Sequence, residues 1–198
     1  MAAIFADITD PSVATQLRSG SIGVIPTDTV YGLVCIAVDE KAVARLYATK
    51  KEHHKPGTLI AETIEQLESL GFKRRYLTAT QQFWPGAVSI LTPLSDPKTA
   101  YLRLGQYGLA VRLPDDKKLQ ALLKKTGPLL SSSANYPNKP PANTIEEAEV
   151  YFDDGVDFYV DGGDLKGRKP STIIRVVDDA VEVLREGAVT IKNNGATK

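Results

Sequence analysis

A proline-broken segment between two short apolar runs, Gly23 to Leu33, constrains the fold of this chain more than any other stretch. Its centre reads Pro26-Thr27-Asp28-Thr29-Val30-Tyr31-Gly32. Proline fixes one backbone angle and removes an amide donor, whereas glycine permits angles that other residues avoid. The pattern predicts strands at 22–25 and 33–38, joined by a shaped turn that presents hydroxyl groups. A plain connecting loop is the alternative interpretation.

Helical and strand-like patterns alternate along the rest of the chain. Capping residues and apolar spacing predict helices over 10–20, 39–50, 63–71, 74–84 and 115–125, and another that starts at Thr144. Apolar runs predict strands at 58–61, 87–92, 109–113, 172–177 and 181–184, while 98–107 reads as irregular. This order is typical of an α/β domain with a mixed sheet. We expect a single domain over residues 1–190 and a C-terminal tail over 191–198.

Composition limits the function classes that remain open. The formal net charge is zero, with 24 basic and 24 acidic side chains, so any contact with nucleic acid must come from a local basic patch. No window approaches the roughly 20 apolar residues that a membrane helix needs. The lone Cys35 lies in an apolar run and reads as a buried hydrophobic residue. These features predict a cytoplasmic protein without a membrane segment.

Polar segments follow several of the predicted strands. They lie at 27–31, 50–55, Arg112, 131–135 and 167–172. Open α/β sheets bind ligands beyond strand ends, so we expect these segments to converge on one cleft. Hydroxyls, amides, arginine and lysine dominate them, and this combination suits an anion such as phosphate or carboxylate.

Several common kinds of site are disfavoured. His53 and His54 are adjacent in sequence and do not point at one position, so they predict no metal pair. The sequence contains no Gly-x-Ser-x-Gly elbow, no Walker A loop and no Gly-x-Gly-x-x-Gly. We therefore expect neither a catalytic nucleophile nor a metal held by protein side chains.

Short motifs occur in a defined order along residues 19–187. They read Pro26-Thr27-Asp28-Thr29-Val30-Tyr31-Gly32-Leu33, Trp84-Pro85-Gly86, Val111-Arg112-Leu113-Pro114, Ser131-Ser132-Ser133-Ala134-Asn135, Asp161-Gly162-Gly163, Ser171-Thr172-Ile173 and Leu184-Arg185-Glu186-Gly187. In this order the chain resembles the YrdC/Sua5 family, the L-threonylcarbamoyladenylate synthases, in their short single-domain form.

The resemblance implies a fold and a reaction. The fold is a twisted open mixed β-sheet with flanking helices and a concave, positively lined cavity. The reaction joins L-threonine, bicarbonate and ATP, with Mg²⁺, into threonylcarbamoyl-AMP and pyrophosphate, for the t6A37 modification of tRNA. Implied partners are tRNA or double-stranded RNA and the downstream t6A transferase proteins.

The resemblance also implies roles for individual residues. The threonine-binding residues are Thr29, Arg112, Ser131 and Ser171. The ATP-binding residues are Lys50, Lys51, Ser133, Asn135 and Arg185. With this inventory the protein positions reactants and neutralises developing charge, so no protein nucleophile is required.

One motif departs from the family pattern. Members carry Lys-x-Arg at the end of the second helix, whereas this chain reads Lys50-Lys51-Glu52. A strict match places Glu52 in the arginine position, where a carboxylate would repel phosphate. A one-residue shortening lets Lys51 replace the arginine, without its bidentate fork.

Two other functions stay open. The first is a non-catalytic module that binds RNA or a nucleotide through a basic rim, formed by Lys50, Lys51, Lys55, Lys166, Arg168 and Lys169. The second is a related carbamoyl-adenylating enzyme with another acceptor, in which case Thr29 and Arg112 would not be needed for activity.

Overall fold

The computed structural model describes residues 2–178 and 180–191 of the chain. Its α-helices are α1 (Pro11–Arg18), α2 (Glu40–Lys50), α3 (Ile64–Glu68), α4 (Arg74–Thr78), α5 (Lys117–Thr126) and α6 (Ile145–Phe152). Three short 3₁₀ helices are η1 (Gln81–Phe83), η2 (Pro97–Arg103) and η3 (Asp153–Gly155). The strands are β1 (Ala3–Phe5), β2 (Gly23–Ile25), β3 (Gly32–Ile36), β4 (Thr58–Ile60), β5 (Val88–Pro93), β6 (Gly108–Arg112), β7 (Leu129–Ser133), β8 (Phe158–Val160), β9 (Thr172–Val177) and β10 (Ala180–Arg185).

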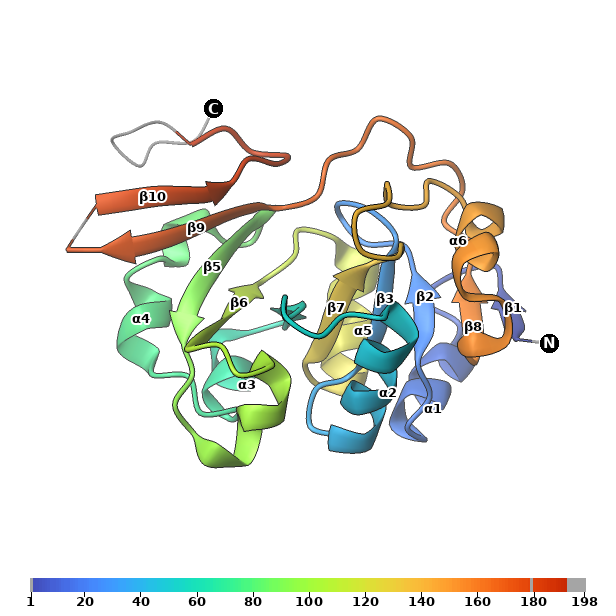
Figure 1. Ribbon diagram of the computed structural model, residues 1–198, viewed down its shortest axis with the longest axis horizontal. Coiled ribbons are helices and arrows are strands. Elements are labelled where there is room, and N and C mark those ends of the chain that lie inside the picture. The colour runs from blue at the N-terminus through green and yellow to red at the C-terminus, as the bar shows by residue number, and fades with distance from the viewer. Residues whose placement is uncertain (1, 179, 192–198) are drawn as a thin grey trace.

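All these strands belong to one twisted open sheet (Figure 1), in the order β1-β8-β2-β3-β7-β4-β6-β5-β9-β10. The sheet contains parallel pairs such as β4–β6 and β5–β9 and antiparallel pairs such as β2–β3 and β3–β7. The mixed sheet and its flanking helices confirm the predicted fold class.

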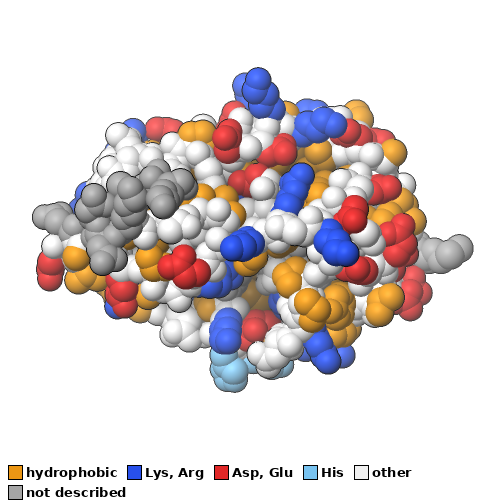
Figure 2. Space-filling model, turned by 90° about the horizontal axis from the view of Figure 1, so that it is seen from above, with side chains coloured by type: hydrophobic (Ala, Val, Ile, Leu, Met, Phe, Trp, Pro, Cys, Tyr) orange, Lys and Arg blue, Asp and Glu red, His pale blue; other side chains and the backbone are white. Residues whose placement is uncertain are grey.

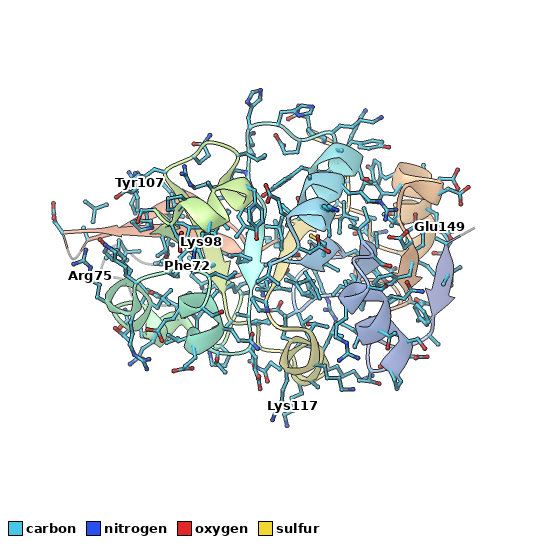
Figure 3. All side chains as sticks on the ribbon, turned by 90° about the horizontal axis from the view of Figure 1, so that it is seen from below. Phe72, Arg75, Lys98, Tyr107, Lys117 and Glu149 are labelled. Carbon is cyan, nitrogen blue, oxygen red and sulfur yellow. The ribbon has the colours of Figure 1, made fainter. Side chains whose placement is uncertain are left out.

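Helices cover both faces of the sheet. Side chains alternate across a strand, and β3 sends Leu33 and Cys35 to one face and Val34 and Ile36 to the other. The first pair packs with α2 and α6, and the second with α1 and α5. Charged side chains such as Lys117 of α5 point outward (Figure 3). Cys35 is fully buried, as predicted, and this burial raises the pKa of its thiol.

Two predicted elements differ from the structure, and the short strand β1 adds to the predicted ones. The helix expected over 74–84 ends at Thr78 and resumes as η1, since the Thr80 hydroxyl bonds the carbonyls of Tyr76 and Leu77 at 3.1 and 3.2 Å. The segment expected to be irregular contains η2, whose start Asp96 caps. Strand β1 was not predicted, and its pairing with β8 stabilises it. Its three residues are too few to show a period.

The spacing of Thr63 and Gln66, and of Thr144 and Glu147, predicts a capping box at the start of each helix, and both boxes close one residue earlier than this pattern implies. Thr63 and Thr144 each accept the expected bond from the third helical amide. The reciprocal side chains, Gln66 and Glu147, instead accept from the amides of Glu62 and Asn143, at 2.9 and 2.7 Å. Both helices begin as predicted.

The structure describes only the first residue of the predicted C-terminal tail, which was expected over 191–198. Ile191, expected in the tail, is buried in the core, while 192–198 lie outside the described residues. None of the helices formed by the described residues has the length and apolar character that a membrane crossing requires.

Tyr31 links the shaped turn to the long segment that leads from β8 to β9. Figure 1 shows this segment passing over the edge of the sheet. The fully buried Tyr31 donates from its hydroxyl to the carbonyl of Gly163 at 2.8 Å and accepts from the amide of Gly162 at 2.8 Å. Burial raises the pKa of this phenol. The contact fixes the path of the segment that continues to Ser171.

Replacing Tyr31 with phenylalanine removes both bonds and leaves two backbone groups without a partner. We expect a loss of about 2 kcal/mol in the free energy of unfolding, measured by urea denaturation. Tyr151→Phe is the control, because its hydroxyl makes a single exposed bond to Pro140. Equal losses in the two variants would contradict this role for Tyr31.

Candidate functional site

A small polar pocket of about 120 Å³ lies where the β2–β3 turn, the end of β6, the serine run of β7 and the start of β9 meet. Of the predicted ligand-binding residues, the structure brings these to its wall: Thr29, Arg112, Ser131, Ser133, Ser171 and Arg185. Four of the five polar segments expected to converge therefore do so, whereas no residue of 50–55 lines this pocket, and Asn135 is not among the lining residues either.

The shaped turn is held from within by Thr27. Its hydroxyl donates to the carbonyl of Val30 at 2.6 Å, accepts from the amide of Thr29 at 3.1 Å and contacts the Thr29 hydroxyl at 3.0 Å. Gly32 completes the turn, since a Cβ there would lie 2.8 Å from the Ser131 hydroxyl oxygen. The turn is thus an ordered part of the pocket wall, as the prediction of a shaped turn required.

Arg112 ends strand β6 and is 3% exposed. Its Nη1 donates to Oδ1 of Asp28, the residue at the centre of the shaped turn. The Nε of Arg112 and the Oδ2 of Asp28 are both buried and have no hydrogen-bond partner among the described residues. The pocket therefore contains a guanidinium donor that is ready for a second anion.

A second guanidinium faces the same pocket. Arg185 donates from Nη2 to the carbonyl of Ser171 at 2.7 Å and to its hydroxyl at 3.2 Å. Ser171 also exchanges a hydrogen bond of 2.8 Å with Ser89. Partial burial and the positive charge of Arg112 lower the pKa of Arg185. The two arginines are thus close enough to interact, and Asp28 balances one of their charges.

Lys50, at the end of α2, lies next to the pocket wall. It is 4% exposed, and its ammonium donates to the Ser133 carbonyl and to Oδ1 of Asn135, the latter at 2.9 Å. Burial lowers the pKa of Lys50 to about 8. The Asn135 amide nitrogen donates to the carbonyls of Tyr136 and Lys139. The structure therefore unites Lys50, Ser133 and Asn135 in one network.

Neither candidate for the missing arginine faces the pocket. The ammonium of Lys51 lies 4.2 Å from the centre of the Tyr136 ring, a cation–π contact. One Glu52 carboxylate oxygen accepts the amides of residues 53, 54 and 55 at 2.9–3.0 Å. Although partial burial opposes it, these bonds lower the pKa of Glu52. The Glu52 carboxylate is thus bonded to the amides of its own loop, and the repulsion between this carboxylate and phosphate that a strict motif match implies does not arise in this conformation.

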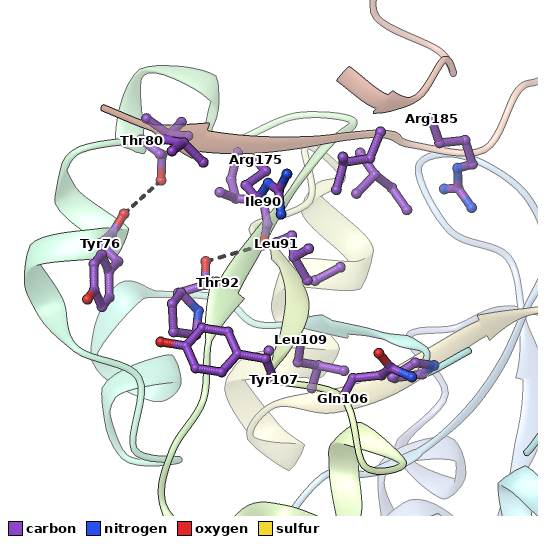
Figure 4. Close-up of a pocket in the computed structure, with 18 of the residues that line it drawn as sticks. Tyr76, Thr80, Ile90, Leu91, Thr92, Gln106, Tyr107, Leu109, Arg175 and Arg185 are labelled. Atoms are coloured by element: carbon purple, nitrogen blue, oxygen red, sulfur yellow. Dashed lines mark hydrogen bonds between the residues drawn. The ribbon is translucent and has the colours of Figure 1, made fainter. Parts of the chain in front are cut away.

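A wider groove of about 980 Å³ adjoins the pocket and shares Pro56, Gly57, Ala110, Ile173 and Arg185 with it. Figure 4 shows Tyr76 and Tyr107 on one side of it and Arg175 and Arg185 on the other, around Ile90 and Leu109 of the sheet. Sequence reasoning missed this groove, because its wall comes from separate strands that carry no motif. On the face seen from above, lysine and arginine side chains surround a hollow (Figure 2).

The described residues contain no group of three or more histidine, cysteine or acidic side chains placed to hold a metal ion. His53 and His54 are exposed loop residues whose rings meet edge to face, with centres 6.5 Å apart.

Comparison with known proteins identifies relatives of this chain in sequence and in structure. The threonylcarbamoyl-AMP synthase of Pseudomonas syringae is 33% identical over 88% of this chain and 95% of its own length. The Bacillus subtilis synthase is 31% identical over 94% of this chain, which spans 58% of that protein. The crystal structure of P. abyssi Sua5 complexed with L-threonine superposes with a TM-score of 0.83, at 26% identity over 96% of this chain and 58% of that one.

The same assignment comes from the sequence pattern of a whole family. Residues 15–187 match the Sua5/YciO/YrdC family, which is described under the heading of telomere recombination. The match includes the shaped turn, Arg112, the serine run and Arg185, the parts that form the pocket. This chain belongs to the Sua5/YciO/YrdC family.

Proposed function

We propose that this protein is an L-threonylcarbamoyladenylate synthase, which makes threonylcarbamoyl-AMP and pyrophosphate from L-threonine, bicarbonate and ATP. The observation that carries the proposal is the buried Arg112, which lines a pocket of about 120 Å³ together with hydroxyl-bearing residues and whose Nε has no hydrogen-bond partner among the described residues. Such a pocket has room for a small amino acid and not for a nucleotide. Relatives of nearly the same length are named for this activity.

In this assignment Arg112 binds the carboxylate of threonine, because a guanidinium matches a carboxylate in charge and geometry. The hydroxyls of Thr29, Ser131 and Ser171 line the same pocket and supply the remaining polar contacts. The related structure with bound L-threonine supports this choice of ligand.

ATP is assigned to the neighbouring network of Lys50, Ser133 and Asn135, together with Arg185. Lys50 and Arg185 supply the positive charge for the phosphates. Lys51 stays a candidate, and it takes part only if its ammonium leaves the Tyr136 ring. Mg²⁺ enters as part of the Mg–ATP substrate, since it keeps several waters and binds through phosphates.

The chemistry follows from this placement. The amine of threonine forms a bond to the carbon of bicarbonate, and a C–O bond breaks as water leaves. An oxygen of the resulting carbamate then attacks the α-phosphorus of ATP, and the bond from that phosphorus to pyrophosphate breaks as pyrophosphate leaves. The protein holds both reactants and stabilises the developing negative charge with Arg112, Arg185 and Lys50.

We further propose that the product serves t6A37 formation on tRNA in the cytoplasm, through downstream t6A transferase proteins.

An RNA-binding module is less well supported. Lys50, one member of the proposed basic rim, is buried and bonded to Asn135, so it does not belong to an exposed rim. The other members, Lys51, Lys55, Lys166, Arg168 and Lys169, are exposed. Contact with tRNA or double-stranded RNA would therefore rest on these alone.

The test of the proposed function is pyrophosphate release by the purified chain with Mg–ATP. We expect release that requires both L-threonine and bicarbonate. Release without threonine would indicate another acceptor. No release from folded protein would contradict the proposed function.

Arg112→Lys tests the assignment of the threonine carboxylate. Lysine keeps the charge but lacks the fork, so we expect the KM for threonine to rise about 30-fold, with little change in the KM for ATP. Arg175→Lys is the matched control, because Arg175 pairs with Glu182 outside the small pocket. A similar rise in both variants would argue against Arg112 as the carboxylate ligand.

The lowered pKa of Lys50 predicts a pH dependence of ATP binding. Below pH 8 the ammonium is present and available to phosphate, and above pH 8 it is progressively lost. Since affinity scales with the protonated fraction, we expect the Kd for Mg–ATP to weaken about tenfold between pH 7 and pH 9. Lys50→Met should bind weakly at both pH values. An unchanged wild-type Kd over this range would exclude Lys50 from the phosphate site.

A further inference from the structure

The ion pair between Asp28 and Arg112 differs from the other ion pairs of the described residues. Its side chains are 7% and 4% exposed, whereas every other pair has side chains at least 28% exposed. Burying two charges costs several kcal/mol unless hydrogen bonds compensate for the lost water. Here one bond joins the pair, while Asp28 Oδ2 and Arg112 Nε have no partner among the described residues. So costly an arrangement calls for a function.

Both partners are held by ordered structure. Arg112 ends β6, where its carbonyl accepts the Ala61 amide at 3.1 Å. Asp28 is at the centre of the turn that the Thr27 hydroxyl fixes through three contacts. Asp28 is not itself among the residues that line the pocket, whereas Arg112 is. The carboxylate therefore holds the guanidinium from outside the pocket and leaves Nε free.

The charge balance of the pocket depends on this carboxylate. Arg112 and Arg185 both line the pocket, and the charge of Arg112 adds to the effect of burial in lowering the pKa of Arg185. Without Asp28 the two guanidiniums would present two uncompensated charges to one small space. Such a site favours multiply charged anions, and phosphate is the commonest of these near ATP. With Asp28 present, the two arginines and this carboxylate together carry one net positive charge, which matches the single negative charge of one carboxylate.

We propose that Asp28 is a positioning and specificity-determining residue. It orients Arg112 for the carboxylate of the amino acid and keeps phosphate out of the amino-acid pocket. This inference rests on the proposed function, in which the amino acid and the phosphates occupy adjacent parts of one site.

The kinetic test compares wild type with Asp28→Asn, which keeps the shape and removes the charge. For the variant we expect the KM for threonine to rise at least tenfold, the KM for ATP to stay within twofold, and inorganic phosphate to compete with threonine. Wild type should show no such competition. A variant that loses only thermal stability, with KM values and phosphate sensitivity unchanged, would overturn the proposal.

Two further variants separate this role from a merely structural one. Asp28→Glu keeps the charge, so it should exclude phosphate as wild type does, even though its longer side chain displaces Arg112 and raises the KM for threonine. It also decides the matter if Asp28→Asn does not fold, because phosphate competition in Asp28→Glu would overturn the proposal. Asp157→Asn is the control, since Asp157 pairs with Arg45 on a partly exposed surface and should change neither kinetic quantity.

A spectroscopic readout decides the question without any turnover. The Arg112 Nε–H resonance is followed by ¹H–¹⁵N NMR in the full chain, with Arg112→Lys for assignment, while inorganic phosphate is added. We expect phosphate to shift this resonance in Asp28→Asn and not in wild type. Equal shifts in both proteins would overturn the role of Asp28. Because this outcome needs no reaction, failure of the synthase assignment would be seen separately, as an absence of pyrophosphate release.

Discussion

The register of β3 between β2 and β7 is the constraint on which the rest of the site depends. Gly32 lies opposite Ser133 on β7 and opposite Ile25 on β2, so the shaped turn emerges beside the serine run. A Cβ at position 32 would lie 2.8 Å from the Ser131 hydroxyl oxygen, so any other residue there would force that side chain to move. A shift of one residue would turn the apolar side chains of β3 to the wrong faces and separate the turn from β7.

The pocket is built for charge at some cost to stability. A buried arginine–aspartate pair with unused hydrogen-bonding atoms and a buried lysine of lowered pKa are all unfavourable in an empty protein. In the proposed function these groups become favourable when the amino-acid carboxylate and the phosphates of ATP bind, because each then gains a partner of opposite charge. The hydroxyls around them adapt to either state, since a hydroxyl both donates and accepts.

Sequence patterns predicted most of the fold and much of the pocket. Caps such as Asp39 and Thr63 and the apolar run that forms β3 are local signals, and they were read correctly. What the sequence did not show were contacts between distant segments. The Asp28–Arg112 pair spans 84 positions, and nothing in either motif indicates that the carboxylate meets the guanidinium. The orientation of Glu52 depends on the loop that it caps, which no single-residue comparison reveals.

The central claim of this account is that Arg112 recognises an amino-acid carboxylate in the small pocket. Calorimetric titration with L-threonine and with L-threoninol, which lacks the carboxylate and keeps the amine and hydroxyl, tests it most directly. The account predicts measurable binding of L-threonine to the wild-type chain and none of L-threoninol at the same concentrations. Equal affinity for the two ligands, or binding of threonine that survives Arg112→Lys unchanged, would contradict it.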